Sequence, residues 1–195
     1  LIGDKAFYKI LICFQLLEET KNIKGDIIEF GIWNGNNLFT IKKIIDFLKI
    51  KKKLYGYDNF SGFPNPKSVN KKNKKFGIYA GNRKFLRFVI NFFKLKNIEI
   101  IDDDIMNLKR YKSSLKKLSF IYVDCDIYKT TKKILDDLKE KLSIGGVIVF
   151  DEGIYGKKTE EPKALREFHK KYKKNYKKVL LKKKYQPDVY LKKVR

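Results

Sequence analysis

The segments FIYVDCDIYKTT (residues 120–131) and GGVIVFDE (residues 145–152) decide the fold of this chain. Residues 119–123 and 147–150 are short, apolar and rich in β-branched or aromatic side chains, which is typical of parallel strands buried on both faces. Between them, apolar side chains recur at helical spacing up to a glycine pair: Ile134, Leu135, Leu138 and Leu142. We therefore predict one strand–helix–strand unit.

Both strands of this unit end in acidic residues. A right-handed crossover leaves the two strands parallel and adjacent, so both carboxyl ends open on the edge where ligands of open α/β sheets bind. Four acids would converge there: Asp124, Asp126, Asp151 and Glu152. Clustered like charges are costly unless a cation lies among them, and oxygen ligands suit Mg²⁺, Ca²⁺ or Mn²⁺. The alternative is that these acids cap helices or face water.

Length and composition describe a single globular domain spanning residues 1–195. Of the 195 residues, 43% are hydrophobic and 35% are charged, which is enough to bury a core and excludes a disordered tail. The longest early apolar run, residues 10–14, is too short to cross a bilayer. We expect a cytoplasmic protein with no membrane partner. Cys13 and Cys125 lack disulfide or zinc spacing, so we predict that both are reduced and structural.

The net charge of +24 raises the question of a polyanionic partner. Nearly all of the basic residues are Lys, whereas recognition of bases and phosphates favours Arg, so specific nucleic-acid binding is not expected. In the densest cluster, residues 170–178, we interpret Phe168, Tyr172 and Tyr176 as the buried stripe of an amphipathic helix. The alternative is a strip on which nucleic-acid bases stack.

Strands and helices alternate along the rest of the chain. The predicted strands are 26–30, 54–57 and 98–101, followed by the two above and by an antiparallel pair at 179–183 and 188–194. The predicted helices are 4–20, which caps the sheet within an N-terminal segment 1–22, then 37–48, one beginning at Asn82, and one from Pro162 to about Tyr172. The loop 59–81 lacks periodicity, and we predict a lid around residues 65–75. This order predicts an α/β doubly wound fold with a seven-stranded, mostly parallel sheet and a C-terminal antiparallel hairpin.

The segment GDIIEFGIWNGNN (residues 25–37) forms a glycine turn after the first strand. Gly31 and Gly35 allow close approach of a ligand to the backbone, and the following helix N-terminus suits an anion or carboxylate. The GxxxG spacing differs from the GxGxxG fingerprint and disfavours a pyrophosphate. Asp58, at the end of the second strand, is placed to accept both hydroxyls of a ribose, although it could also be a turn residue.

Asp103 and Asp104 follow the third strand, so acids follow each of the first five strands. An adenosine-containing ligand without phosphates is the economical match, which points to S-adenosylmethionine.

The chain resembles the TylF-type macrocin O-methyltransferase family of class I S-adenosylmethionine-dependent methyltransferases, which have a Rossmann-like fold. Four segments carry the resemblance, in the expected order within residues 23–152: GDIIEFGIWNGNN, YGYDNFSGFP, FIYVDCDIYKTT and LSIGGVIVFDE. It implies transfer of a methyl group to a hydroxyl of a sugar or another small molecule, with a divalent metal, Mg²⁺, assisting. The resemblance does not identify the acceptor or the oligomeric state, and a homo-oligomer is one of the alternatives.

The resemblance also implies a role for each matching position. Glu29 and Gly31, with Gly35 in the same turn, would lie along the methionine part of the cofactor, Asp58 on its ribose, and Asp103 or Asp104 near its adenine. The metal ligands would be Asp124, Asp151 and Glu152, and the catalytic residues Asp124 and Asp126, with Asp126 orienting the substrate or acting as base. The family usually shows paired Asp residues where this chain has Asp151 and Glu152.

Two other functions are weighed against this one. An RNA methyltransferase is supported only by the basic surface, and the chain reads DCDIY where an Asn-Pro-Pro-Tyr-like loop would be expected for amino-group methylation. A non-catalytic polyanion-binding protein of the same fold would not need an acidic edge. The single histidine, His169, is predicted to be a surface residue and not the base.

Overall fold

The computed structural model describes residues 3–63, 79–154, 160–182 and 185–195. Strands and helices alternate as predicted, with a 3-10 helix, η1, after the third strand. In chain order the elements are α1 (Asp4–Thr20), β1 (Asp26–Phe30), α2 (Asn36–Phe47), β2 (Leu54–Asp58), α3 (Arg83–Phe92), β3 (Ile98–Asp102), η1 (Ile105–Arg110), β4 (Leu118–Val123), α4 (Tyr128–Leu138), β5 (Leu142–Phe150), α5 (Glu161–Tyr172), β6 (Tyr176–Leu180) and β7 (Val189–Lys193). The predicted lid around residues 65–75 lies outside the described residues.

The seven strands form one sheet in the order β3-β2-β1-β4-β5-β7-β6. The first five are parallel, while β7 runs antiparallel to both β5 and β6, which confirms the predicted sheet and its C-terminal hairpin. The strand order reverses between β1 and β4. Phe30 pairs with Val123, and Val123 with Phe150, so the carboxyl ends of β1, β4 and β5 lie level at this reversal. Ligands of doubly wound sheets bind at such a point.

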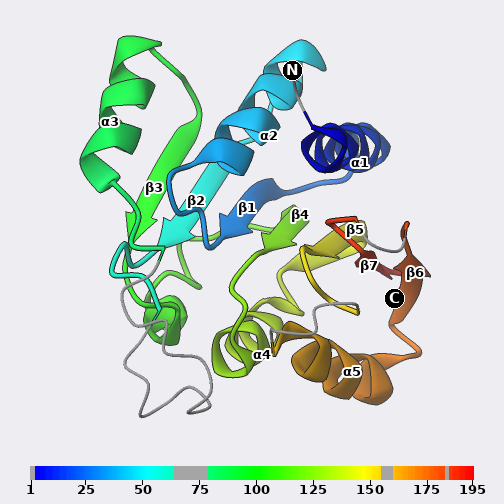
Figure 1. Cartoon of the computed structure of the whole chain (residues 1–195). Helices are drawn as coiled ribbons and strands as arrows, with labels where there is room; N and C mark the ends of the chain where they lie inside the picture. The colour runs from blue at the N-terminus through cyan, green and yellow to red at the C-terminus, as the bar shows by residue number, and fades with distance from the viewer. Residues whose placement is uncertain (1–2, 64–78, 155–159, 183–184) are drawn as a thin grey trace.

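Helices cover both faces of the sheet (Figure 1): α1, α2 and α3 lie on one side, and α4 and α5 on the other. Because side chains alternate along a strand, Ile27 packs in the cluster under α1 and α2, and Ile28 in the cluster with α4 and α5. Both faces are buried, which explains why β4 is buried at every position. The helix α1 packs on α2, β4 and β5, as a cap should.

Two residues lie in a different element from the predicted one. Leu142 begins β5 and pairs with Leu118, because the chain turns after α4 ends at Leu138. Tyr176 begins β6 instead of continuing α5, but its ring still packs on Phe168, with the ring centroids 5.1 Å apart. Both side chains are buried, so burial was predicted correctly while the element was not. Among the described helices, none is long and apolar enough to span a membrane.

Candidate functional site

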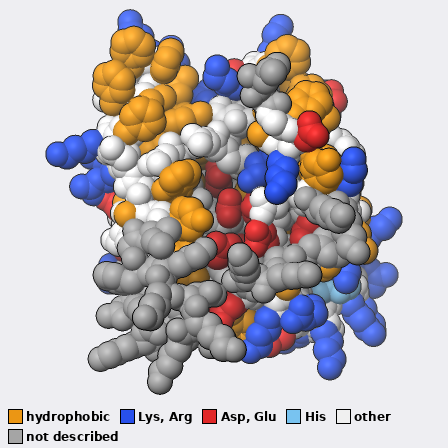
Figure 2. All heavy atoms as spheres, viewed as in Figure 1, with side chains coloured by type: hydrophobic (Ala, Val, Ile, Leu, Met, Phe, Trp, Pro, Cys, Tyr) orange, Lys and Arg blue, Asp and Glu red, His pale blue; other side chains and the backbone are white. Residues whose placement is uncertain are grey.

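A cavity of about 620 Å³ opens at the carboxyl ends of the parallel strands. Figure 2 shows acidic side chains gathered in the middle of this face, with Lys and Arg spread around its edge. Seven of the residues predicted for the site line the cavity: Gly31, Asp58, Asp104, Asp124, Asp126, Asp151 and Glu152. The topology therefore brings together acids that follow β2, β3, β4 and β5. Glu29, Gly35 and Asp103 are not among the lining residues.

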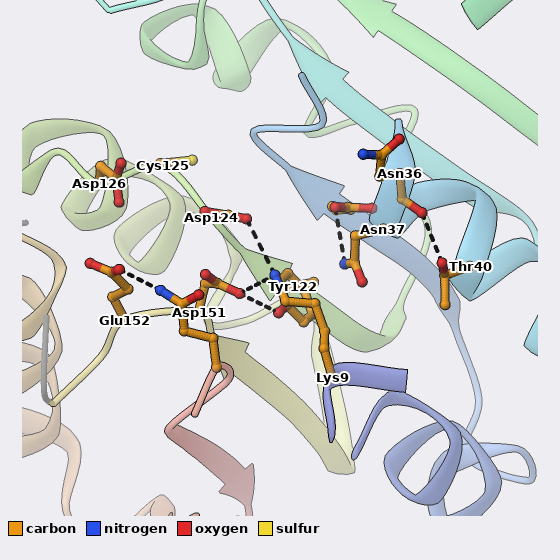
Figure 3. Close-up of polar contacts among 12 residues, drawn as sticks. Lys9, Asn36, Asn37, Thr40, Tyr122, Asp124, Cys125, Asp126, Asp151 and Glu152 are labelled. Atoms are coloured by element: carbon orange, nitrogen blue, oxygen red, sulfur yellow. Dashed lines mark hydrogen bonds and ion pairs between the residues drawn. The ribbon is translucent and has the colours of Figure 1, made fainter. Parts of the chain in front are cut away.

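A lysine lies among the acids at the ends of β4 and β5 (Figure 3). Lys9 of α1 places its Nζ 2.6 Å from Oδ1 of Asp151 and 4.0 Å from Oδ2 of Asp124. The Tyr122 hydroxyl donates a 2.6 Å hydrogen bond to the same Asp151 oxygen. Burial by itself lowers the pKa of Lys9, but Asp151 and then Asp124 outweigh it and raise that pKa above its ordinary value. Lys9 is therefore a charged ammonium that neutralises the acidic edge.

The pKa of Asp124 is nevertheless raised in this site. Burial, and after it the neighbouring Asp151 charge, raises the pKa of Asp124 well above its ordinary range, while Lys9 opposes the rise. Burial likewise raises the pKa of the Tyr122 hydroxyl. A raised pKa makes a carboxylate a stronger proton acceptor, which is the property of a general base.

The predicted metal ligands do not fit a divalent ion as they are placed. Each of them already interacts with a protein group: Asp151 accepts from Lys9 and Tyr122, Glu152 accepts from the side-chain amide of Gln186, and Asp124 forms an ion pair with Lys9 at 4.0 Å. Within the described part of the chain, no group of three His, Cys, Asp or Glu side chains could hold a metal ion. Mg²⁺ needs several oxygens at about 2.1 Å, and the Lys9 ammonium stands where such an ion would meet Asp151.

Glu161, a residue that sequence reasoning missed, holds the two acidic loops together. It is fully buried at the start of α5, and its Oε1 accepts hydrogen bonds from the backbone N–H groups of Cys125 (2.8 Å) and Asp126 (3.2 Å). Its Oε2 accepts one from the N–H of Glu152 at 3.3 Å. Burial raises the pKa of this carboxyl to about 8. Glu161 thereby fixes the loop after β4 against the loop after β5.

This clamp also sets the conformation of Asp126. The residue adopts a left-handed backbone with φ of 58°, which Asp tolerates better than most residues. Its N–H is held by Glu161, and its carbonyl accepts a 2.8 Å hydrogen bond from the N–H of Glu160. With its backbone fixed from both sides, Asp126 lines the cavity beside Asp124.

Glu29 lies near the end of β1 and is only 1% exposed. Its Oε1 accepts a 3.1 Å hydrogen bond from the Asn37 side chain, whereas its Oε2 is buried without a hydrogen-bond partner among the described residues. Burial raises the pKa of this carboxyl to about 8, and Asn37 opposes the rise. A buried carboxylate oxygen without a donor is a position that suits a cationic group, such as the amino group of a methionine moiety.

The two glycines of the turn are needed mainly for packing. A Cβ on Gly31, where φ is 81°, would stand 1.9 Å from the carbonyl oxygen of Asp124, so glycine lets β1 and β4 approach each other at the switch point. At Gly35, where φ is 82°, a Cβ would meet the Leu86 side chain at 2.3 Å. Gly31 lines the cavity, whereas Gly35 is not among the lining residues.

Asp58 lies at the end of β2 and organises the turn after β1. Its Oδ2 accepts a 2.8 Å hydrogen bond from the N–H of Trp33, and its Oδ1 accepts one of 2.8 Å from the N–H of Phe60. Burial raises the pKa of this carboxyl, and four backbone N–H groups, those of Phe60, Trp33, Asn59 and Ile32, oppose the rise. Each oxygen keeps a further lone pair, so Asp58 is both a structural turn residue and a lining residue able to accept hydroxyls.

The acids after β3 divide into two roles. Asp103 accepts hydrogen bonds from Asn107 (2.7 Å) and from the Tyr111 hydroxyl (3.1 Å), and these contacts, led by Asn107, lower its pKa. Asp104 caps η1 through a 2.8 Å hydrogen bond from the N–H of Met106, and it lines the cavity. Of the two acids proposed to lie near an adenine, Asp104 is therefore the one at the cavity.

The remaining reactive residues lie as follows. Cys13 is buried in α1, and Cys125 lines the cavity; both are free cysteines. His169 lies on α5, which packs on the opposite face of the sheet, and it is not a lining residue.

Two signals in the sequence could have found the missed residues. Lys9 precedes the buried residues Cys13, Leu16 and Thr20 of α1 at helical spacing, so it is a lysine on the buried stripe. A lysine there needs an acidic partner. Glu161 stands next to Pro162 in the first turn of a helix, where a carboxylate can accept free N–H groups. Neither signal identifies the residues that Lys9 and Glu161 contact in the folded protein.

Comparisons with known proteins show the family and the fold of this chain. The family described as Macrocin-O-methyltransferase (TylF) matches residues 1–182. A relative from Streptomyces niveus, named demethyldecarbamoylnovobiocin O-methyltransferase, is 23% identical over 169 residues, which cover 78% of this chain and 61% of that protein. The chain thus spans less than two thirds of the length of this curated relative.

Solved structures share the fold. The O-methyltransferase NovP superposes with a TM-score of 0.80 at 20% identity and covers 100% of this chain and 81% of its own. The calicheamicin methyltransferase CalS11 has a TM-score of 0.76 at 18% identity and covers 98% of this chain and 80% of its own. With the family match extending over most of its length, the chain belongs to the macrocin O-methyltransferase (TylF) family.

Proposed function

We propose that this protein is an S-adenosylmethionine-dependent O-methyltransferase that acts on a hydroxyl of a sugar or of another small molecule. The observation that carries the proposal is the cavity at the β1/β4 switch point, which Asp58 lines at the end of β2. The charges of the lining residues Lys9, Asp58 and Asp151 act on Glu29, whose buried Oε2 has no hydrogen-bond partner among the described residues. The names of two curated relatives support the class of acceptor, since both are O-methyltransferases and one is named for methylation of a rhamnosyl derivative.

The residues at hand suit S-adenosylmethionine. Asp58 can accept the two ribose hydroxyls. Burial keeps Glu29 protonated below about pH 8, and it would pair with the methionine amino group as a carboxylate after losing that proton. Ile105 and Met106 line the cavity after Asp104 and provide an apolar surface for an adenine ring. When bound, S-adenosylmethionine supplies an electrophilic methyl group, and the acceptor O–C bond forms as the S–C bond breaks.

The acidic residues of the cavity include a candidate base for the acceptor hydroxyl. Asp124 and Asp126, which are separated by Cys125 in the sequence, both line the cavity, and we assign one of them as the base that accepts the hydroxyl proton. Trp33 and Tyr79 line the same cavity with their rings edge to face, 5.8 Å between centroids, and form an apolar wall for a sugar ring. Catalysis then depends mostly on holding two substrates in line. Metal assistance, which the family resemblance implies, is not included, because the donor set does not fit a divalent ion.

The first test is ligand binding. S-adenosylhomocysteine at a hundred times its Kd should stabilise the fold by about 2.7 kcal/mol, measured as a rise in Tm, whereas NAD⁺ should have no effect because the turn lacks a pyrophosphate cradle. No shift at saturating S-adenosylhomocysteine contradicts the proposal.

The second test is methyl transfer. Radiolabelled S-adenosylmethionine, a panel of nucleoside diphosphate sugars and structured RNA would be compared at physiological salt. Label in a sugar supports the proposal. Label in the RNA alone would show that the acceptor is RNA and not a sugar.

A further inference from the structure

The acids that the family resemblance assigns to a metal already hold a cation from the chain itself. Lys9 reaches them from α1, a helix far away in the sequence, and its side chain is only 23% exposed. Its Nζ contacts Asp151 at 2.6 Å and also lies 5.7 Å from the centroid of the Tyr122 ring, so the ammonium is held from more than one side. The contact between Lys9 and Asp151 is part of the folded site, because burying a lysine without a partner costs free energy.

Lys9 occupies one of the two carboxylate oxygens of Asp151. The Asp151 Oδ1 atom accepts from both the ammonium and the Tyr122 hydroxyl, each at 2.6 Å. A divalent ion within bonding distance of this oxygen would lie against a positive charge. At the adjoining position, the Glu152 Oε1 atom accepts from Gln186, a residue of the segment before β7.

We propose that Lys9 is the resident cation of this site, that it replaces a divalent metal there, and that it positions the acceptor hydroxyl beside Asp124. This inference rests on the proposed function. An ammonium has three N–H donors, and only Asp151, at 2.6 Å, lies within hydrogen-bond distance of it, because Asp124 at 4.0 Å is an ion-pair partner only. N–H donors of Lys9 can therefore serve a ligand in the cavity that Lys9 lines. A donor at this place stabilises the negative charge that develops on the acceptor oxygen as its proton passes to a carboxylate.

Mn²⁺ binding can be measured at this site without an acceptor substrate. Its binding, measured by electron paramagnetic resonance, would be compared among the wild type, Lys9→Met, Lys9→Arg and Lys5→Met, the last of these altering an exposed lysine one turn earlier on α1. Wild type, Lys9→Arg and Lys5→Met should show no specific Mn²⁺ binding. Lys9→Met leaves two carboxylates without a cation, so it should bind Mn²⁺ at least about tenfold more tightly than the wild type.

Two further readouts complete the test. Lys9→Met should have a lower Tm than the wild type, and MnCl₂ should raise the Tm of this variant but not that of the wild type. The Mn²⁺ bound by Lys9→Met should be lost in Lys9→Met/Asp124→Asn, which places it at the acidic edge.

Two results overturn the inference. One is specific Mn²⁺ binding by the wild type that Asp124→Asn abolishes, because the acids then hold a metal in the presence of Lys9. The other is a folded Lys9→Met that binds Mn²⁺ no better than the wild type. If Lys9→Met does not fold, the wild type and Asp124→Asn decide the question between them. A missing Tm shift with S-adenosylhomocysteine would contradict the proposed function while leaving this Mn²⁺ comparison intact.

Discussion

Replacing Glu29 by glutamine should change how the stability of this protein depends on pH. Burial raises the pKa of the Glu29 carboxyl from 4.5 to about 8. A raised pKa means that the folded state holds a proton that the unfolded state has lost, so stability falls as the pH rises from about 4.5 through 8. Glutamine copies the size and neutrality of the protonated acid and does not titrate, so Glu29→Gln should lack this loss.

The size of the effect follows from the two pKa values. Between pH 6 and pH 9, a carboxyl whose pKa changes from about 8 to 4.5 on unfolding lowers the free energy of unfolding by roughly 3 kcal/mol, at about 1.4 kcal/mol for each pH unit in which the proton count differs. Urea unfolding at both pH values measures it. The difference between wild type and Glu29→Gln should therefore grow by roughly 3 kcal/mol in favour of the variant on going from pH 6 to pH 9.

A matched control is Glu18→Gln, which changes an acid whose side chain is 50% exposed on α1. It should shift the unfolding free energy equally at both pH values. If the wild type and Glu29→Gln instead lose the same free energy between pH 6 and pH 9, Glu29 titrates as an ordinary solvated acid, and the reasoning about its burial and unpaired oxygen is wrong.

Three further changes test the architecture of the site. Gly31→Ala should cost about 3 kcal/mol or more in urea unfolding, because its Cβ would overlap the Asp124 carbonyl, whereas Gly3→Ala, with nothing within 4 Å, should leave stability unchanged. Glu161→Ala removes the acceptor of three backbone N–H groups and should cost about 3 kcal/mol or more by the same measurement; a loss below about 1 kcal/mol would contradict its clamping role. Asp58→Asn should weaken S-adenosylhomocysteine binding by about 10- to 100-fold in calorimetry, and unchanged affinity would remove Asp58 from the ribose site.

The topology was predictable because it depends on local patterns. Runs such as β4, buried at every position, and the amphipathic helices between them determine a parallel doubly wound sheet. The residues that were placed in the wrong element, Leu142 and Tyr176, follow the ends of helices, where apolar spacing fits a helix or a strand equally well. Backbone hydrogen bonds decide such positions, and the sequence pattern does not show them.

The candidate site was predictable to the extent that topology determines it. Asp58, Asp124 and Asp151 lie at one edge because parallel strands end at the same level, and all three line the cavity. The roles of Asp103 and Glu29 were harder to predict, because their environment depends on Tyr111 and Asn37, which reach them from other elements. A carboxylate looks the same in a sequence whether it is exposed, paired or buried.

The sequence by itself determined that acids would gather where β1, β4 and β5 end, since strand order and side-chain alternation follow from short-range patterns. Only the tertiary structure decided what those acids contact. The packing of α1 against β4 and β5 brings Lys9 to Asp151, and the start of α5 brings Glu161 to the two acidic loops. These pairings join residues far apart in the chain, and they depend on the angle at which a helix packs on the sheet. No local pattern encodes that angle, so the cation of this site was visible only in the folded protein.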